Sequence, residues 1–346
     1  MSVTKILTSW YSVNKRDFPW RETTDPYKIW LSEIILQQTQ IKQGLPYYQL
    51  FVNKYPTVFQ LSNANESDVL KLWQGLGYYS RARNLHATAK YIVNDLKGEF
   101  PTTYKELIKL KGIGDYTASA IASISFNEQT AVLDGNVYRF LSRYYGIDTP
   151  INTTSGFKIF KTLAQDVLDK THPAEHNQAI MDFGSRQCAP SNPDCSICPF
   201  NKSCVAFREN RVSELPVKIK ANKPVKKYFN FLVFISDSSE TILEKRQEKG
   251  IWKNLYQFPL IETEKTVSLD SLLLTLKKHH LTTHLDFDLS LFNDVDIVHK
   301  LSHQHLHTKF WILTTKKLPI KGIPSNKIKD YAVPVLIEKF IDDFNF

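Results

Sequence analysis

The four cysteines of this 346-residue chain all lie in one short loop, at Cys188, Cys195, Cys198 and Cys204. The prolines and polar residues between them favour tight turns, so four thiolates can converge on one metal centre. Two structural disulfides fit less well, because a chain of this size builds its own core and shows no export signal. Four-cysteine zinc sites usually pair two C-x2-C knuckles across a longer gap, and this loop has one knuckle. The C-x6-C-x2-C-x5-C spacing suits one 4Fe–4S cluster, which is the cofactor that we predict.

A glycine-rich turn, Lys-Gly-Ile-Gly-Asp at 111–115, separates two predicted helices over 104–110 and 116–126. Two glycines two residues apart permit a hairpin whose backbone amides point outward at the start of a helix. Such amides, aided by the helix dipole, can hold a phosphate group. A plain connector between helices is the alternative interpretation.

Two carboxylates stand in apolar surroundings. Glu33 lies in the segment Ile29–Leu36, which is apolar almost all round, and no charged residue shares its helical face. We therefore expect a buried carboxyl with a raised pKa, able to donate a proton near neutral pH. Asp134 follows the apolar residues 131–133 at the entry to another predicted helix, where an N-cap is the simplest role for it.

Length and composition predict two domains. Hydrophobic residues make up 42% of the chain and aromatic residues 12%, which is enough to build cores. With no signal peptide and no apolar run of membrane-spanning length, we expect a monomeric protein of the cytoplasm, nucleoid-associated if bacterial. The net charge is +9, and both halves are basic when the chain is divided at residue 215. This charge is compatible with a polyanionic partner and equally with a solvated lysine-rich surface.

The pattern of the chain changes near residue 210. Apolar residues recur at helical spacing over 27–204, whereas the composition of 228–235 and 305–314 predicts strands, with a predicted helix over 269–278 between them. We predict an all-α domain over 1–210 that includes the cysteine loop, a basic linker over 211–227, and an α+β domain over 228–346.

The order of these motifs resembles the endonuclease III superfamily of helix-hairpin-helix DNA glycosylases, and most closely the MutY-type adenine DNA glycosylases. The resemblance implies an enzyme of base excision repair that removes adenine mispaired with 8-oxoguanine or guanine in double-stranded DNA. The residues that carry it are Pro19-Trp20-Arg21, Leu31 to Thr39, Leu72 to Leu85, the glycine hairpin, Asp134-Gly-Asn-Val, Asn177 to Gly184 and the cysteine loop.

The resemblance also assigns the chemistry. Glu33 protonates the purine ring, and Asp134 faces the sugar, where a carboxylate stabilises the developing oxocarbenium ion, as in glycoside cleavage. Bifunctional relatives carry a nucleophilic lysine two residues after the second hairpin glycine, where this chain has Tyr116. A phenol cannot form an imine, so we expect base removal by water without efficient strand scission. Tyr116 is expected either to hydrogen-bond Asp134 or simply to pack.

A base inside a duplex must be flipped out before it reaches such a pocket. By resemblance, Trp20, Arg21 and Gln178 line the adenine pocket, although some relatives carry Glu at the last of these positions. A second set of residues matches positions that contact DNA in the family. Side chains at four of these positions enter the duplex and fill the gap in the base stack, and the two glycines belong to the hairpin that holds a phosphate: Gln38, Thr39, Leu76, Tyr78, Gly112 and Gly114.

The C-terminal half resembles a Nudix (MutT-like) domain. It lacks the glutamate-rich R-E-x-x-E-E sequence that holds magnesium, so pyrophosphate hydrolysis is not expected. In MutY-type enzymes this domain recognises 8-oxoguanine through a loop that often reads F-S-H, and here the loop reads Leu301-Ser302-His303. We predict that Ser302 and His303 bind the oxidised purine. A metal bound by the neighbouring histidines is disfavoured, since alternation along a strand accounts for their pattern.

Two other functions stay open at this point. A bifunctional glycosylase-lyase for oxidised pyrimidines is disfavoured by Tyr116 and by the Nudix-like half. A non-enzymatic iron–sulfur DNA-binding protein, or a nucleotide hydrolase, is disfavoured by Glu33 with Asp134 and by the missing magnesium-binding sequence.

Overall fold

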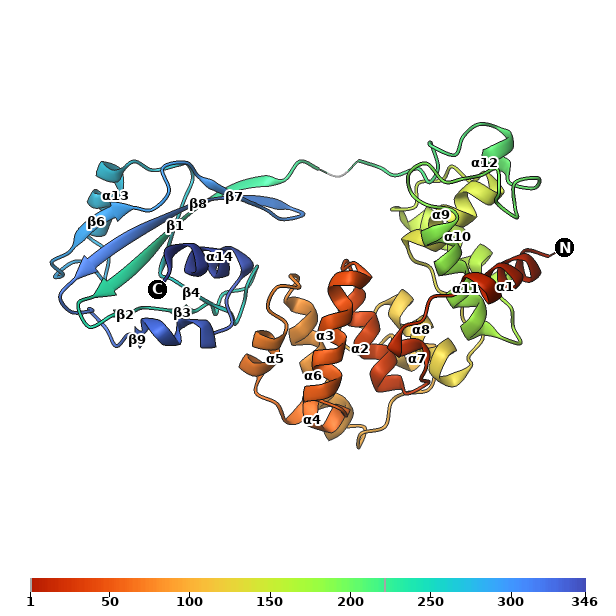
Figure 1. The fold of residues 1–346 in the computed structure, drawn as a ribbon, viewed down its shortest axis with the longest axis horizontal. Coiled ribbons are helices and arrows are strands. Elements are labelled where there is room, and N and C mark those ends of the chain that lie inside the picture. Colours follow the sequence, from red (N-terminus) through yellow and green to blue (C-terminus); the bar gives the residue numbers. More distant parts are fainter. Residues whose placement is uncertain (1, 221) are drawn as a thin grey trace. The chain divides into compact units, whose positions relative to one another are not determined.

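The structure is a computed structural model that describes residues 2–220 and 222–346. The chain forms two compact units (Figure 1). The first unit consists of Met1–Asn63 and Asn84–Lys220, and the second of Ala64–Arg83 and Ala221–Phe346. The division near residue 220 falls within the predicted linker. The sequence did not indicate that a segment of the helical half, 64–83, belongs to the second unit.

Every regular element described between residues 27 and 204 is a helix, which confirms the predicted all-α region. Helix α5 (Glu66–Leu72) lies in the second unit, and α6 (Ser80–Asn94) begins there and continues into the first. The first unit also contains α1 (Val3–Asn14), η1 (Pro19–Arg21), α2 (Pro26–Leu36), α3 (Ile41–Lys54), α4 (Val58–Asn63), α7 (Tyr104–Leu107), α8 (Asp115–Phe126), α9 (Gly135–Tyr145), α10 (Thr154–Asp166), α11 (Pro173–Arg186) and α12 (Val205–Arg208).

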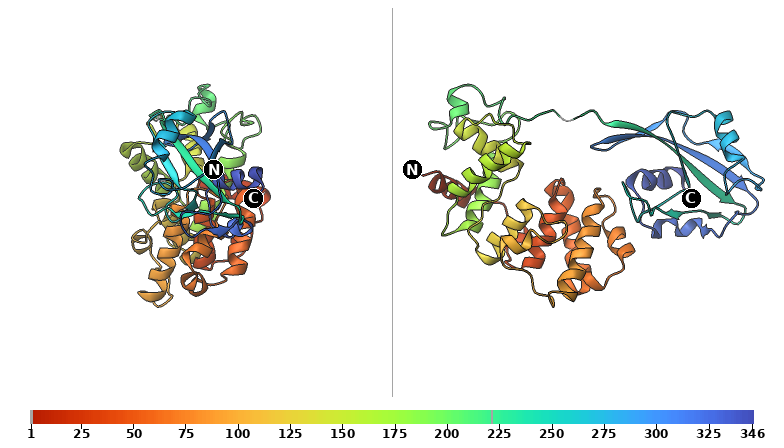
Figure 2. Two further views of the ribbon diagram at one scale, coloured as in Figure 1. Left: turned by 90° about the vertical axis from the view of Figure 1, so that its left-hand side faces the viewer. Right: turned by 180° about the vertical axis from the view of Figure 1, so that it is seen from behind.

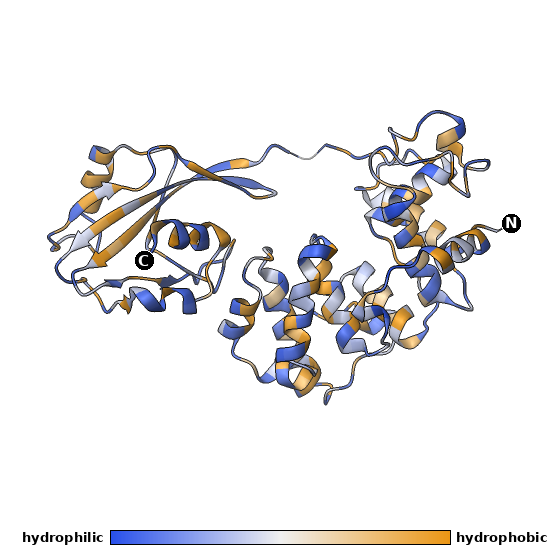
Figure 3. Cartoon of the chain, viewed as in Figure 1, coloured by the Kyte–Doolittle hydropathy of each residue, from blue (hydrophilic) through white to orange (hydrophobic). Residues whose placement is uncertain are grey.

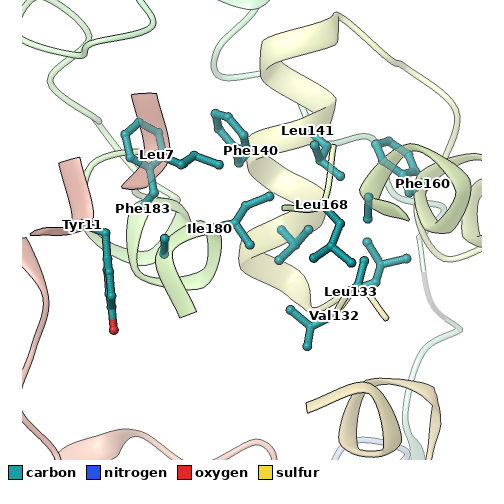
Figure 4. Packing of buried hydrophobic residues seen from close by; sticks show 14 of the residues in the cluster. Leu7, Tyr11, Val132, Leu133, Phe140, Leu141, Phe160, Leu168, Ile180 and Phe183 are labelled. Atoms are coloured by element: carbon teal, nitrogen blue, oxygen red, sulfur yellow. The ribbon is translucent and has the colours of Figure 1, made fainter. Parts of the chain in front are cut away.

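The core of the first unit is formed by α1, α9, α10 and α11, together with the segment that leads into α9 (Figure 4). Phe140, Phe183 and Phe200 pack edge to face or tilted, with ring centroids 5.1 Å apart in each pair. Such aromatic contacts stabilise beyond the burial of their surface. The cluster fixes the start of α9, and therefore the position of the residue that precedes it. Its buried members include Leu7, Tyr11, Val132, Leu133, Phe140, Leu141, Phe160, Leu168, Ile180 and Phe183.

Helix α2 is buried on nearly all sides, in agreement with its apolar sequence. Its N-cap Asp25 accepts a hydrogen bond from the backbone N–H of Tyr27 at 2.9 Å, which starts the helix. Every residue from 29 to 35 is buried, and the helix packs against α3 and α8. Any polar side chain on this helix therefore has to lie inside the protein.

The second unit contains a five-stranded sheet in the order β5-β1-β8-β6, with β7 also pairing with β8. Strands β1 and β8 run parallel, and the other pairs are antiparallel. This arrangement confirms the predicted α+β class. The elements are β1 (Val225–Ser236), β2 (Glu240–Thr241), β3 (Glu244–Lys245), β4 (Tyr256–Gln257), β5 (Leu260–Thr263), α13 (Leu269–Leu276), β6 (Asp288–Leu291), β7 (Ile297–Lys300), β8 (Gln304–Thr315), β9 (Ile323–Pro324), η2 (Ser325–Asp330) and α14 (Val335–Phe344).

Helices cover both faces of this sheet, which is seen from behind in Figure 2. Phe310 of β8 stacks on Phe340 of α14, with ring centroids 4.0 Å apart. Its neighbour Trp311 points to the other face and packs in a cluster with Leu272 and Leu276 of α13. A sheet covered on both faces needs continuous apolar runs. Figure 3 shows apolar stretches in β1 and β8. In β1, residues 229–234 are all buried.

Within residues 2–220 and 222–346, the helices are too short or too polar for any of them to span a lipid bilayer.

Candidate active site

Glu33 on α2 is a buried carboxylate, with 8% of its surface exposed. Burial raises its pKa from 4.5 to about 7, because a charged carboxylate is poorly solvated there. The hydrogen bond with Tyr116 and the charge of Arg21 oppose this rise, whereas the charge of Asp134 adds to it. The predicted burial and raised pKa are confirmed, so Glu33 can hold a proton at neutral pH.

Tyr116, on the first turn of α8, lies close enough to Glu33 and Asp134 for both charges to act on its hydroxyl. The hydroxyl can hydrogen-bond Glu33 and lies 3.4 Å from Sδ of Met181. One hydroxyl proton serves one acceptor at a time, so it favours the carboxylate when Glu33 is ionised. Burial raises the pKa of Tyr116 well above its usual value, so the phenol stays neutral. The position of the hydroxyl makes Sδ of Met181 its hydrogen-bond acceptor in this structure, and Glu33 and Asp134 act on it through their charges.

Asp134 is the N-cap of α9. Its Oδ1 accepts from the backbone N–H groups of Asn136 and Val137 at 2.9 and 2.8 Å, and its Oδ2 accepts from Asn136 Nδ2 at 2.7 Å. Burial is the largest influence on Asp134 and raises its pKa, although these three hydrogen bonds oppose the rise. The cap thus holds the carboxylate in one orientation, and the charge of Asp134 acts on both Glu33 and Tyr116. Asp134 can therefore cap α9 and still present its negative charge to Glu33 and Tyr116.

Asp182 on α11 is a charged group whose role the sequence did not reveal, although it lies inside a motif that carries the family resemblance. Its side chain is fully buried and accepts from Nη1 and Nη2 of Arg21 at 2.7 and 2.8 Å. Arg16 forms a second ion pair with it. The paired guanidinium groups lower the pKa of Asp182 against the effect of burial. Asp182 therefore fixes Arg21 where its charge reaches Glu33.

The other two residues of the predicted adenine pocket belong to the same unit. Gln178 on α11 accepts a hydrogen bond from the hydroxyl of Tyr11 at 2.8 Å through Oε1, which leaves its amide N–H₂ as the donor end. Trp20 is buried, stacks on Phe18 and meets Tyr48 edge to face. Tyr11 contributes to these surroundings, although the sequence did not single it out.

The hairpin at 111–115 has the geometry expected of it. Gly112 has φ +81°, a left-handed conformation that favours glycine. A Cβ added at Gly112 would lie 2.7 Å from Cβ of Asn84, whereas one added at Gly114 would meet nothing within 4 Å. Gly114 is exposed and is the N-cap of α8, and it has no side chain to accept a hydrogen bond from the first amides of this helix. Thr88 donates to the carbonyl of Lys111 at 2.7 Å and anchors the turn.

The segment after α2 carries the next two predicted DNA-contacting residues. Gln38 is exposed and has φ +55°, which is uncommon for a residue other than glycine. Thr39 donates to the carbonyl of Gln37 at 3.3 Å. Strained backbone of this kind is concentrated at functional sites.

In the second unit, the structure brings four predicted residues together around one cavity: Leu76, Tyr78, Ser302 and His303. Ser302 and His303 form the tip of the β7–β8 hairpin. The hydroxyls of Tyr78 and Ser302 lie 2.6 Å apart, within hydrogen-bonding distance. Tyr78 is 53% exposed and has φ +45°, so the chain holds an aromatic ring toward solvent. The sequence did not place Trp252, which also lines this cavity.

The histidines around this hairpin contact other side chains of the second unit. His307 forms an ion-pair contact with Asp296 at 3.6 Å and stacks on Tyr228. Among the described residues, no three or more His, Cys, Asp or Glu side chains are grouped as they would be around one metal ion, and this holds for the four cysteines as well as for the histidines.

The four cysteines are all free thiols, and they line one cavity with Phe140, Phe183 and Phe200. Burial raises the pKa of Cys195, Cys198 and Cys204, the second of them to about 12. Positive and dipolar groups oppose this rise. Arg143 donates to Sγ of Cys188 at 3.5 Å, and backbone N–H groups of Phe200 and Phe207 hydrogen-bond Cys198 and Cys204. Donors directed at buried sulfurs are the surroundings that thiolate ligands of an iron–sulfur cluster use.

A chain of hydrogen bonds runs from the cysteine loop to Asp134. Nη2 of Arg139 donates to Oδ1 of Asn136 at 2.8 Å, and its Nε donates to the carbonyl of Cys188 at 2.8 Å. Asn136 in turn donates to Asp134. The loop and the carboxylate are therefore held by the same helix, α9.

Comparisons with known proteins agree with this geometry. A family model described as the HhH-GPD superfamily of base excision DNA repair proteins matches residues 31–163, and a NUDIX domain model matches residues 230–343. An adenine DNA glycosylase of Buchnera aphidicola (subspecies Baizongia pistaciae) is 36% identical over 90% of this chain and 86% of its own length. The human adenine DNA glycosylase is 42% identical over 58% of this chain and 38% of its own length.

Two solved structures resemble part of this chain. A thermostable thymine-DNA glycosylase has a TM-score of 0.56 and 29% identity, covering 60% of this chain and 95% of its own. An endonuclease III in a non-covalent complex with DNA has a TM-score of 0.52 and 19% identity, and the match covers 61% of this chain and 99% of the endonuclease chain. The second likeness shows the fold alone. The predicted combination of a helix-hairpin-helix glycosylase fold and a Nudix-like domain is thereby confirmed.

Proposed function

Since the chain belongs to the family of adenine DNA glycosylases, which serve base excision repair, we propose that it removes adenine paired with 8-oxoguanine or guanine, flipping the base out of the duplex and releasing it by hydrolysis alone. The observation that carries this proposal is the buried carboxyl of Glu33, whose pKa of about 7 suits a proton donor at neutral pH. The protein acts as a monomer, with 1–210 as the catalytic domain, 211–227 as the linker and 228–346 as the recognition domain.

The proposed reaction divides the work between two carboxylates. Glu33 gives its proton to a ring nitrogen of the flipped adenine, so the electrons of the breaking C1′–N9 bond leave with a neutral base. The sugar becomes an oxocarbenium ion, which Asp134 stabilises as an anion held by its helix cap. Water then adds at C1′ and loses a proton, and the ionised Glu33 can take it up. Arg21, fixed by Asp182, limits the pKa of Glu33 and lines the pocket with Trp20 and Gln178.

Tyr116 supports hydrolysis without strand scission. It occupies the position of the lysine that forms a Schiff base in bifunctional relatives, and a neutral phenol beside Glu33 cannot form an imine. Its hydroxyl is placed to stabilise the ionised form of Glu33 after the proton has left. In our proposal, Tyr116 therefore assists Glu33, the general acid, and takes no part as a nucleophile.

DNA contacts outside the pocket come from both units. The backbone amides that follow Gly112 and Gly114 are suited to a backbone phosphate. Gln38 and Thr39, and Leu76 and Tyr78, are proposed to fill the gap that the flipped adenine leaves. Ser302 and His303 are proposed to read the opposite base, since their exposed side chains offer hydroxyl and imidazole groups to the N7–H and O8 of 8-oxoguanine.

The cysteine loop fits a 4Fe–4S cluster, because four free thiols line one cavity and donors from Arg143 and two backbone amides point at the sulfurs. Cys188, Cys195, Cys198 and Cys204 would hold it. When bound, such a cluster supplies a structural cross-link and a one-electron centre. Arg143 and Arg139 fasten the loop to α9, and hence to the helix that Asp134 caps.

The experiment that tests this function is base release under single-turnover conditions. The purified full-length protein is incubated with duplexes that contain A:8-oxoguanine, A:G, A:T or thymine glycol, with and without alkali. We expect adenine release from the first two duplexes, strand breaks only after alkali, and little borohydride trapping. Release of thymine glycol with trapping at the same rate would instead identify a bifunctional enzyme for oxidised pyrimidines. Release from A:T as fast as from A:8-oxoguanine would contradict the proposed selectivity.

A further inference from the structure

Asp115 places a negative charge at the hairpin, where a DNA phosphate is proposed to bind. It is the first residue of α8 and directly follows Gly114, the exposed N-cap, which has no side chain to bond the first helix amides. The positive end of a helix that attracts a phosphate attracts this carboxylate as well. An unpaired negative charge here would repel the DNA backbone. The residue therefore needs a partner if the hairpin is to bind DNA.

Lys161 on α10 supplies that partner and is held firmly. Its ammonium group lies 2.9 Å from Oδ1 and 3.0 Å from Oδ2 of Asp115. It also donates to Oγ of Ser119 at 3.0 Å and to the carbonyl of Ala131 at 2.7 Å. An ammonium group has three donors, and these three partners use all of them. Both charged side chains are about four-fifths buried, with 21% and 18% exposed, so water screens their pairing less than at an open surface.

Tyr104, at the start of α7, completes the surroundings of Asp115. Its hydroxyl donates to Oδ1 at 2.8 Å, and its ring lies 5.4 Å from the ammonium group of Lys161. Burial, together with this hydrogen bond and the nearby charge, raises the pKa of Tyr104 to about 12, so it remains a donor. The carboxylate of Asp115 thus receives hydrogen bonds from two helices. Tyr104 lies on α7, just before the hairpin, and Lys161 lies on α10, far along the chain.

We propose that Lys161 is a positioning residue for DNA binding, which neutralises Asp115 and holds its carboxylate away from the phosphate that the hairpin amides bind. This inference rests on the proposed function, because it requires DNA at the hairpin. Lys161 itself touches no DNA. Its contribution is to the charge and orientation of the loop, and the comparisons give no role to this residue.

The proposal predicts effects of opposite sign for the two partners. Lys161→Gln keeps a hydrogen-bonding side chain but leaves Asp115 uncompensated, so duplex affinity should fall about tenfold at low salt and less at high salt. Asp115→Asn keeps an acceptor for Tyr104 but leaves Lys161 with an excess positive charge, so affinity should rise about threefold. The double variant should return to within about twofold of the natural protein.

The measurement is the affinity of the full-length protein for an A:8-oxoguanine duplex carrying a non-hydrolysable adenosine analogue, at two salt concentrations. Lys158→Gln is the matched control, because Lys158 is an exposed lysine on the same helix. If Lys161 has only a structural role, both single variants and the double variant weaken binding, and the proposal is wrong. Equal effects of Lys158→Gln and Lys161→Gln would also overturn it. If Lys161→Gln does not fold, Asp115→Asn alone tests the proposal: a rise in duplex affinity supports it, and a fall overturns it.

This design separates the inference from the proposed function. Binding and adenine release by the natural protein test the function, whereas the signs of the variant effects test Lys161. Single-turnover rates at saturating DNA should stay within about twofold in the control Lys158→Gln, since Glu33, Asp134 and the Asp115–Lys161 pair are unchanged.

Discussion

Glu33 and the tip of the β7–β8 hairpin place polar side chains in opposite environments. Glu33 is 8% exposed on a helix that is buried on nearly all sides, whereas Ser302 and His303 are exposed at the end of two strands. The carboxyl gains its function from burial, because desolvation raises its pKa to about 7. In our proposal the hairpin residues need exposure, because they have to meet a base that arrives from solution.

The two regions also differ in how firmly the surrounding groups hold them. Asp134 is bonded by three donors, and Asp182 fixes Arg21 with two hydrogen bonds. Ser302 has a hydrogen-bonding contact with Tyr78, itself an exposed side chain. Chemistry thus uses a rigid interior, in which geometry and charge are fixed before the substrate binds. Recognition uses groups whose partners can be exchanged for those of the DNA.

The largest expected effect comes from removing either carboxylate. Glu33→Gln cannot donate a proton, and Asp134→Asn cannot balance the positive sugar, so each should lower the single-turnover rate of adenine release by about 10²–10⁴-fold. Asn keeps the cap through Oδ1, but its amide nitrogen would face the donor Nδ2 of Asn136, so Asp134→Asn should lose some thermal stability, though less than a variant without the cap. Rates and melting temperatures are measured together.

Asp134→Ala is the control, since it loses the cap as well and should cost about 1 kcal/mol of stability. A near-natural rate in either Glu33→Gln or Asp134→Asn would break the proposed division of labour. Retained affinity for A:8-oxoguanine duplexes shows that the variants still bind DNA.

Asp182→Asn should have the next largest effect, because it leaves two guanidinium groups without their shared carboxylate. Breaking a buried ion pair costs several kcal/mol, and the partial exposure of Arg16 reduces the figure here to about 2–4 kcal/mol of unfolding free energy. Urea denaturation measures this loss. Asp169→Asn, at a carboxylate more open to solvent shortly before α11, is the control. If Asp182→Asn proved as stable as this control, Arg21 would not be held by the pair.

The hairpin tip should affect selectivity without affecting catalysis. Ser302→Ala and His303→Ala should each reduce the preference for 8-oxoguanine over guanine by about 1–3 kcal/mol, the usual value of a base-edge contact. The ratio of single-turnover kcat/KM for the A:8-oxoguanine and A:G duplexes measures this preference.

Truncation near residue 215 should have the same consequence, while intrinsic adenine release persists. Because the second unit also includes 64–83, the truncated protein has to be shown to be folded by circular dichroism before it is interpreted. If a folded truncation discriminates as well as the full chain, recognition lies in the first unit and the contrast between the two regions is wrong.

The smallest expected effect is the pH dependence of the rate. Glu33 acts in its protonated form, and its raised pKa of about 7 keeps that form populated up to neutral pH. The rate of adenine release should therefore fall about tenfold for each unit above pH 7, and it should also fall at acid pH, where Asp134, whose pKa burial raises, becomes protonated. A rate that rises between pH 7 and pH 8 would contradict general acid catalysis by Glu33. Leu301→Phe, a change at the hairpin tip, should leave this profile unchanged.

Local patterns in the sequence were sufficient for a large part of the fold and the site. The apolar run around Glu33 predicted burial and a raised pKa, because a helix that is hydrophobic on every side has nowhere else to lie. The spacing of the glycines predicted the hairpin, whereas the 4Fe–4S cluster that the four cysteines predicted stays a proposal. Each of these inferences depends on residues only a few positions apart, whose relative geometry the backbone fixes.

Long-range contacts were decided by the tertiary structure alone. The sequence could not show that Tyr116 lies beside Glu33, or that Asp182 holds Arg21 across 161 residues. Nor could it place residues 64–83 with the C-terminal half, where Tyr78 meets Ser302. Periodicity reports which face of an element is buried, but not which distant element covers it. The partners of a charged group follow from packing, and so the final pKa of Glu33 belongs to the folded chain.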